Sequence, residues 1–170
     1  SKCYTSTSVE FKPKKNKDRD VIFEFENEIN HPFGQKIKLF ISEIEKYFKF
    51  LNNHDIHIKS KNNFPHSSGI ASSASSMSSL SSCLVDFELL NSKSKEDSYY
   101  TKKKSFIARL GSGSASRSIE GPITLWGSSN SYLGSSDLYA INISDDVNKV
   151  FHDYQNSILI IDPGVKKISS

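Results

Sequence analysis

The chain has 170 residues, of which 36% are hydrophobic and 24% are charged, so it can build the core of one folded domain. Its net charge of +3 is only mildly basic, and its lysines gather in separate runs without interleaved aromatic residues, which argues against a nucleic-acid ligand. No stretch reaches the ~20 apolar residues of a membrane-spanning helix and no signal peptide is recognisable, so no membrane partner is expected.

The two cysteines, Cys3 and Cys83, are far apart in sequence and have no partner ligands at metal-binding spacing. We interpret them as free, reduced thiols, which predicts a cytoplasmic protein. Cys83 falls in the apolar phase of a predicted helix, so we expect it in the core. His54 and His57 also lack ligand spacing and are interpreted as structural or solvent-facing.

The first third of the chain predicts two strands, a helix and a third strand. Thr5 to Phe11 and Val21 to Phe25 alternate in polarity around a polar turn, so we expect them to pair as a hairpin. A helix is predicted from Pro32 to the Asn52-Asn53 pair, because apolar residues recur there at intervals of three and four: Ile37, Ile41, Ile44, Phe48 and Leu51. The alternation around Ile56 and Ile58 predicts the next strand.

Two more helices and three short strands are predicted in the rest of the chain. The helices run from Gly69 to Leu90, a segment rich in serine, and from a Ser94-to-Asp97 start signal to a stop at Gly111. The strands are residues 122–126, 138–143 and 157–162. Helices and strands mixed in this order predict an α+β fold rather than a doubly wound sheet.

A candidate anion site precedes the serine-rich helix, in the run NNFPHSSGIASSASSMSSL at residues 62–80. Pro65 fixes a turn, Gly69 lets backbone approach a ligand, and the helix start offers free N–H groups and a positive dipole end. Such an end binds phosphate. The alternative is a serine-rich helix with an ordinary cap, since Ser and Gly favour helix starts in any case.

A second candidate site is the run ARLGSGSASRSIEG at residues 108–121. Gly111 and Gly113 allow close approach, Ser112 and Ser114 supply hydroxyl groups, and Arg117 can bind a carboxylate or phosphate with two parallel hydrogen bonds. A flexible linker is the alternative for a Gly/Ser tract, but apolar residues anchor this one on both sides. Arg117 could also simply pair with Glu120 at the surface.

Together these two runs, in this order and followed by Trp126-Gly127, resemble the diphosphomevalonate decarboxylase family of the GHMP small-molecule kinase superfamily. The resemblance implies a GHMP-type N-terminal domain with a ribosomal-protein-like β-α-β core. It also implies a decarboxylase of isoprenoid biosynthesis that uses ATP and Mg²⁺ on mevalonate 5-diphosphate. Relatives are commonly homodimers, and this expectation is carried over.

The resemblance assigns roles to individual residues. The ATP phosphates are expected on Pro65, Ser67, Ser68, Gly69, Ala71, Ser72 and Ser73, with Mg²⁺ on the hydroxyls of Ser72 and Ser73. The substrate is expected on Ser112, Gly113, Ser114, Arg117 and Ser170. Ser73 and Arg117 are the catalytic candidates, Arg117 as the group that orients the departing carboxylate. Ser116 stands where relatives often have Cys.

We expect residues 1–170 to be most of the N-terminal domain, truncated at both ends. Met77 is the only methionine, and the family's active-site Lys and essential Asp have no counterpart in this chain. A fragment of this kind is expected to be inactive alone. The alternative functions are a GHMP-family kinase that phosphorylates a mevalonate derivative without decarboxylation and, outside enzymes, a serine-rich interaction module.

Overall fold

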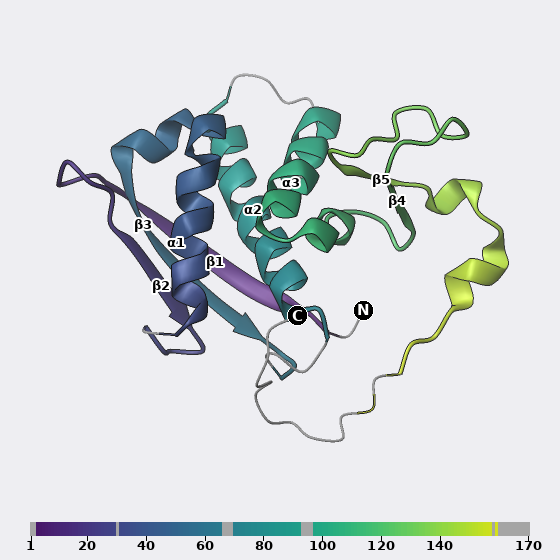
Figure 1. Ribbon diagram of the computed structural model, residues 1–170, viewed down its shortest axis with the longest axis horizontal. Coiled ribbons are helices and arrows are strands. Elements are labelled where there is room, and N and C mark those ends of the chain that lie inside the picture. Colours follow the sequence, from purple (N-terminus) through teal and green to yellow (C-terminus); the bar gives the residue numbers. More distant parts are fainter. Residues whose placement is uncertain (1–2, 30, 66–69, 93–96, 158, 160–170) are drawn as a thin grey trace.

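The computed structural model describes residues 3–29, 31–65, 70–92, 97–157 and 159. Its strands and α-helices in chain order are β1 (Thr5–Pro13), β2 (Val21–Phe25), α1 (Phe33–Ile44), β3 (His54–Asn62), α2 (Ser72–Leu90), α3 (Asp97–Gly111), β4 (Thr124–Trp126) and β5 (Ala140–Asn142). In Figure 1 the helices lie against the sheet formed by β1, β2 and β3, and the small β4–β5 ribbon lies beyond α3. The predicted α+β fold class is confirmed.

The core lies between the sheet and the helices, because each element presents one apolar face to it. On β2 and β3 the buried residues alternate with exposed or half-buried ones, as the strand period requires. The helices contribute residues at intervals of three and four. The buried set includes Phe23, Phe25, Ile56 and Ile58 from strands and Ile37, Ile41, Ile44, Met77, Leu80, Leu84 and Ile107 from helices.

The predicted hairpin between the first two strands is wrong. β3 lies between them, antiparallel to β1 from the pair Thr5 and Asn62 to the pair Pro13 and His54, and parallel to β2 from the pair Val21 and Ile56. The connection from β1 to β2 therefore crosses the beginning of β3. β2, α1 and β3 form a β-α-β unit.

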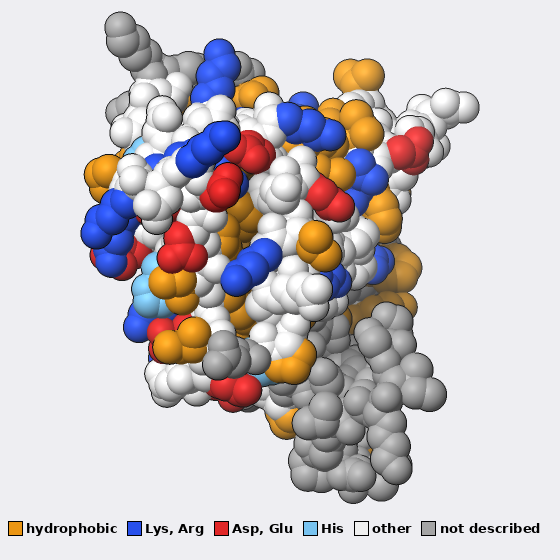
Figure 2. All heavy atoms as spheres, turned by 60° about the vertical axis from the view of Figure 1, so that its left-hand side comes forward, with side chains coloured by type: hydrophobic (Ala, Val, Ile, Leu, Met, Phe, Trp, Pro, Cys, Tyr) orange, Lys and Arg blue, Asp and Glu red, His pale blue; other side chains and the backbone are white. Residues whose placement is uncertain are grey.

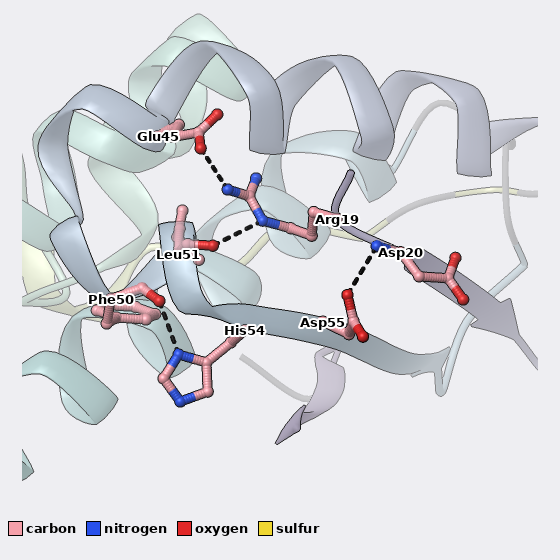
Figure 3. Close-up of polar contacts among 7 residues, drawn as sticks. All are labelled: Arg19, Asp20, Glu45, Phe50, Leu51, His54 and Asp55. Atoms are coloured by element: carbon pink, nitrogen blue, oxygen red, sulfur yellow. Dashed lines mark hydrogen bonds and ion pairs between the residues drawn. The ribbon is translucent and has the colours of Figure 1, made fainter. Parts of the chain in front are cut away.

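Polar contacts at this crossing explain why the connection passes over β3 (Figure 3). Asp55, at the beginning of β3, accepts hydrogen bonds from the backbone N–H groups of Asp20 (2.9 Å) and Lys15 (3.3 Å). The Asp20 N–H, the largest of these influences, lowers the pKa of the Asp55 carboxyl. Arg19 donates to the Leu51 carbonyl at 2.8 Å and pairs with Glu45 of the segment after α1.

The first helix is shorter than predicted. α1 ends at Ile44, and two 3-10 turns, Glu45–Tyr47 and Lys49–Asn53, follow it. Phe48 between them has extended backbone, which interrupts the helix, yet Phe48 and Leu51 are fully buried. The apolar spacing thus identified the right core residues, but tertiary contacts such as that from Arg19 decide the backbone.

The serine-rich helix has the predicted end, Leu90, but begins at Ser72. Its apolar stripe is confirmed at Ala74, Met77, Leu80 and Leu84, with Phe87 half-buried. Cys83 is half-buried rather than in the core; its Sγ lies 3.4 Å from the Thr7 carbonyl oxygen, and burial raises the pKa of its thiol.

The third helix ends at Gly111 as predicted, while its expected start signal at Ser94 lies outside the described residues. The strands expected at 122–126 and 138–143 are confirmed as the shorter β4 and β5, which pair antiparallel from Thr124 and Asn142 to Trp126 and Ala140. The strand expected at 157–162 is not present at Ser157 or Leu159, and its remaining residues lie outside the described part.

The sequence argued against a nucleic-acid ligand and a membrane partner, and the structure bears on both expectations. Lys, Arg, Asp and Glu side chains are interspersed on the face drawn in Figure 2, with no large area of one sign. Within the described segments, no helix combines the length and apolar character needed to cross a bilayer.

Candidate nucleotide and substrate site

The first wall of the site is the N-terminal end of α2. Ala71 precedes the helix in the left-handed conformation (φ 54°, ψ 37°) and provides no side-chain cap. Its carbonyl accepts the N–H of Ser75 at 3.1 Å, which begins the helical hydrogen bonding. The first-turn N–H groups of Ser72, Ser73 and Ala74 therefore have no acceptor within the helix and are suited to an anion.

Thr5 holds the two ends of the loop that leads into α2. Its Oγ1 lies 2.7 Å from Asn62 Oδ1 at the end of β3 and 2.7 Å from Ser75 Oγ in the first turn of α2. The amide Nδ2 of Asn62 is buried and has no hydrogen-bond partner among the described residues. The alternation of β1 gave no sign of this role for Thr5, because the contact joins residues far apart in sequence.

The second wall is the turn that follows α3. Gly111 ends the helix against Met77 of α2 and Phe40 of α1: a Cβ on Gly111 would lie 2.5 Å from Met77 Sδ and 3.0 Å from Phe40 Cε2. Ser112 is extended, and a 3-10 turn, Gly113–Ser118, follows. Gly111 therefore allows the end of α3 to lie close to α2.

The two walls meet at their serines. Ser73 Oγ lies 3.4 Å from Ser112 Oγ, and both side chains are half-buried. The structure thus brings together two residues that are 39 positions apart in the sequence, one from each of the two runs. Ser72 is half-buried next to Ser73, Ser114 is half-buried within the turn, and Gly113 is exposed.

Hydrogen bonds from buried serine hydroxyls to backbone carbonyls hold the 3-10 turn in place. Ser78 of α2 contacts the Ala115 carbonyl at 2.8 Å, and Ser105 of α3 donates to the Ser116 carbonyl at 2.8 Å. Ser116, itself buried, donates to the Gly113 carbonyl at 3.1 Å. Sequence reasoning missed Ser78 and Ser105 as supports of the site, although a serine in the buried phase of a helix was a usable signal.

Arg117 is exposed on the 3-10 turn. The ion pair with Glu120 that the sequence left open is not formed, and nowhere in the described chain does the guanidinium have a hydrogen bond or an ion pair. It is therefore free to bind an anion with its planar fork.

A groove of about 1330 Å³ runs along α2 from this end of the helix. Its walls include Thr5 and Phe64, the Ala71 cap, and Ser118, the neighbour of Arg117. A groove of this size has room for a nucleotide or a phosphorylated substrate. Among the described residues, no group of three or more His, Cys, Asp or Glu side chains could hold a metal ion.

Several predicted site residues lie outside the described part of the chain: Ser67, Ser68, Gly69 and Ser170. Pro65 is described and exposed at the entry to the first loop. The predicted roles of all these residues stay predictions.

Residues 1–140 match the family model described as the diphosphomevalonate decarboxylase-like N-terminal domain. A diphosphomevalonate decarboxylase of Ganoderma lucidum is 33% identical over 132 residues, covering 72% of this chain and 31% of that protein. A phosphomevalonate decarboxylase of Haloferax volcanii is 28% identical over 148 residues, covering 86% of this chain and 42% of that protein. The chain thus spans less than half the length of these relatives.

The fold comparison agrees. The solved mevalonate diphosphate decarboxylase from Enterococcus faecalis, described by its mevalonate diphosphate-mediated ATP binding, aligns with a TM-score of 0.61 and 29% identity, covering 85% of this chain and 40% of that one. A structure of MDDEF in complex with MVAPP, AMPPCP and magnesium aligns with a TM-score of 0.60 and 28% identity, over 85% and 40% of the two chains.

Proposed function

Because the chain belongs to the family of diphosphomevalonate decarboxylase-like N-terminal domains, we propose that it carries the nucleotide and substrate loops of an ATP-dependent decarboxylase of mevalonate 5-diphosphate. The observation that supports this most is the 3.4 Å contact between Ser73 and Ser112, which joins the two loops. A phosphate donor on one loop and its acceptor on the other would then be neighbours.

In this proposal the start of α2 holds the phosphates of ATP. Its first turn, which has no side-chain cap from Ala71, offers the N–H groups of Ser72, Ser73 and Ala74. Mg²⁺ prefers oxygen ligands and is usually shared with substrate phosphates, so the hydroxyls of Ser72 and Ser73 suit it without a carboxylate cluster. With Mg²⁺ bound, charge on the transferred phosphoryl group is neutralised.

The turn after α3 would hold the acceptor. Ser112 and Ser114 present hydroxyl groups to the substrate phosphates, and the free guanidinium of Arg117 binds the carboxylate. The γ-phosphoryl group of ATP passes to the tertiary 3-hydroxyl, whose proton goes to a base. The C3–O bond then breaks with loss of phosphate while the C1–C2 bond breaks with loss of CO₂, and its electron pair forms the double bond of isopentenyl diphosphate.

Positioning accounts for most of the rate in phosphoryl transfer, so the loops themselves are the main contribution of this chain. The base is the family's Asp, which the resemblance locates outside these 170 residues. Residues 1–170 would accordingly form part of the N-terminal domain of a larger enzyme.

The 5-monophosphate is the second candidate substrate, because the Haloferax volcanii relative is a phosphomevalonate decarboxylase. Both substrates have the same tertiary alcohol and carboxylate, so Ser73, Ser112 and Arg117 would serve either. A kinase that does not decarboxylate remains the third alternative.

The test is to incubate the full-length protein with Mg-ATP and either mevalonate 5-diphosphate or its monophosphate, labelled at the carboxyl carbon. We expect one labelled CO₂ and one ADP per turnover with the diphosphate. ADP without CO₂ identifies the kinase, and a higher kcat/KM with the monophosphate identifies the second substrate. Neither product with either substrate contradicts the proposal.

A further inference from the structure

One buried hydroxyl joins the first turn of α2 to the 3-10 turn that follows α3. Ser78 Oγ, on α2, lies 2.8 Å from the carbonyl oxygen of Ala74 and 2.8 Å from that of Ala115. Ser78 is buried, with 5% of the residue exposed at the base of the groove along α2, so both contacts lie in a largely desolvated environment. Because a hydroxyl group has a single proton, the two carbonyls share one donor.

Each of the two carbonyls lies close in sequence to residues with a role in the proposed reaction. Ala74 directly follows Ser73 in the first turn of α2. Ala115 follows Ser114 and lies two residues before Arg117 in the 3-10 turn. The contact with Ala74 spans one turn of the same helix, so a shift of the 3-10 turn relative to α2 would lengthen the contact with Ala115.

The next carbonyl of the same turn is held independently. Ser105 donates to Ser116 O at 2.8 Å, and the Ser105 Oγ accepts the N–H of Ala140, also at 2.8 Å. This second anchor ties the turn to α3 and β5, whereas Ser78 ties it to the helix that begins at the nucleotide loop. Ser78 therefore fixes the position of the turn relative to α2, and Ser105 fixes it relative to α3 and β5.

We propose that Ser78 is a positioning residue that sets the distance between the start of α2, where the proposal places the nucleotide phosphates, and the 3-10 turn Gly113–Ser118, where it places the substrate. The proposal rests on the function proposed above. Removing the hydroxyl leaves the Ala115 carbonyl buried without this donor, so the turn moves to find another partner. Each loop keeps its own ligand contacts, but the phosphoryl donor and the acceptor are no longer aligned.

Steady-state kinetics of Ser78→Ala in the full-length protein test the proposal. We expect kcat to fall roughly 10- to 100-fold, as for a misplacement of about 1 Å. The KM values for ATP and for mevalonate 5-diphosphate should change less than about threefold, because both sets of ligand contacts remain. Ser78→Thr keeps the hydroxyl and should recover most of kcat.

Ser81→Ala is the matched control. Ser81 lies on the same helix, is fully buried, and donates to the Lys104 carbonyl of α3 at 2.6 Å, away from both loops. The two alanine variants should lose similar stability in a thermal melt, but only Ser78→Ala should lose kcat. An equal loss of kcat in Ser81→Ala, or parental kcat in Ser78→Ala, overturns the proposal.

Trp126 provides a readout that needs no turnover. It is the only tryptophan of these 170 residues, and the difference between the parent and a Trp126→Phe variant isolates its emission in the full-length protein. Its ring lies 3.4 Å from where a Cβ on Gly113 would be, so it contacts the start of the turn. We expect Mg-ATP to change the emission of Trp126 in the parent and in Ser81→Ala, and much less in Ser78→Ala.

The two proposals can fail separately. If the parent releases no CO₂, the proposed function fails, and the Trp126 emission still decides whether Ser78 couples the loops. An emission change in Ser78→Ala as large as in the parent then contradicts the coupling. If the parent decarboxylates and Ser78→Ala is equally active, only the role of Ser78 is lost.

Discussion

The loop before α2 and the turn after α3 meet at Ser73 and Ser112, yet they are held in different ways. Thr5 fixes the first loop at its two ends, and Ala71 leaves the first-turn N–H groups of α2 uncapped. The turn after α3 is instead held by hydrogen bonds from the buried hydroxyls of Ser78 and Ser105 to its backbone carbonyls.

This difference indicates how each segment would bind a ligand. Free backbone N–H groups suit the first loop to phosphate oxygens of any geometry. In the turn after α3, the backbone N–H groups of Ser112 and Ala115 already donate to the carbonyls of Ala108 (3.0 Å) and Ser112 (2.8 Å), so we expect recognition of an anionic ligand to depend more on the side chains of Ser112, Ser114 and Arg117. Side-chain substitutions should therefore have larger effects in the turn than in the loop.

The largest effect is expected for Arg117→Lys. Lysine keeps the charge but loses the planar fork, so a carboxylate held by two parallel hydrogen bonds is misaligned. Losing a charge-assisted contact of this kind costs roughly 2–3 kcal/mol, on the order of a hundredfold in kcat/KM. Steady-state kinetics of decarboxylation by the full-length protein measure it.

Arg109→Lys is the control for this substitution. Arg109 lies on α3 and donates to the Leu138 carbonyl at 2.9 Å, outside the two loops, so near-parental kinetics are expected. Near-parental decarboxylation by Arg117→Lys itself would remove Arg117 from the site and break the contrast between side-chain and backbone recognition.

The second prediction concerns the close approach of α3 to α2. Gly111→Ala introduces a Cβ 2.5 Å from Met77 Sδ, and this overpacking should lower the free energy of unfolding by about 1–3 kcal/mol. Gly34→Ala in α1 is the control: its Cβ would lie 3.5 Å from the Phe23 ring, an ordinary contact, and alanine favours the helix by up to about 1 kcal/mol. Urea denaturation of both variants should give changes of opposite sign.

Loss of stability in both glycine variants, or in neither, would contradict the packing described for Gly111. The outcome also matters for the site, because Ser112 follows Gly111 directly. If α3 can move away from α2 without cost, the approach of Ser112 to Ser73 is not fixed by packing.

The sequence predicted most of the core and singled out the two segments that meet at Ser73 and Ser112, but not how they are supported. Apolar periodicity identified most buried residues of α1 and α2, and also Phe48 beyond the end of α1, but not the buried Phe40 and Val85. The strand order could not be inferred, because the choice between a hairpin and a crossing depends on contacts such as Asp55 with Asp20. Ser78 and Ser105 were missed for the same reason: their partners are set by tertiary structure.

The third prediction tests the contact between Ser73 and Ser112. Ser73→Ala should lower kcat about tenfold, with a smaller change in KM, because a hydroxyl that orients a transferring phosphoryl group acts chiefly in the transition state. Ser8→Ala, on the exposed side of β1, is the control and should leave both parameters unchanged. If turnover stays within a few-fold of the parent, Ser73 acts only at the start of the helix.

The smallest effect is expected for Ala71→Gly, which compares backbone strain in the two segments. Ala71 has φ 54°, whereas the described residues of the 3-10 turn include no positive φ. Left-handed backbone costs a non-glycine residue about 1–2 kcal/mol, and glycine avoids that cost but loses about 0.5–1 kcal/mol through its more flexible unfolded chain. The net gain in the free energy of unfolding should be roughly 0.5 kcal/mol.

Ala74→Gly, three residues further on in regular helix, is the matched control and should lose about 1 kcal/mol in the same urea denaturation experiment. Opposite signs for the two alanine-to-glycine changes would show that strain is concentrated where the chain enters α2. If Ala71→Gly is destabilised as much as Ala74→Gly, Ala71 is not left-handed in solution. The uncapped first turn would then lose its structural basis, and the loop before α2 would no longer differ from the turn after α3 in how it meets a ligand.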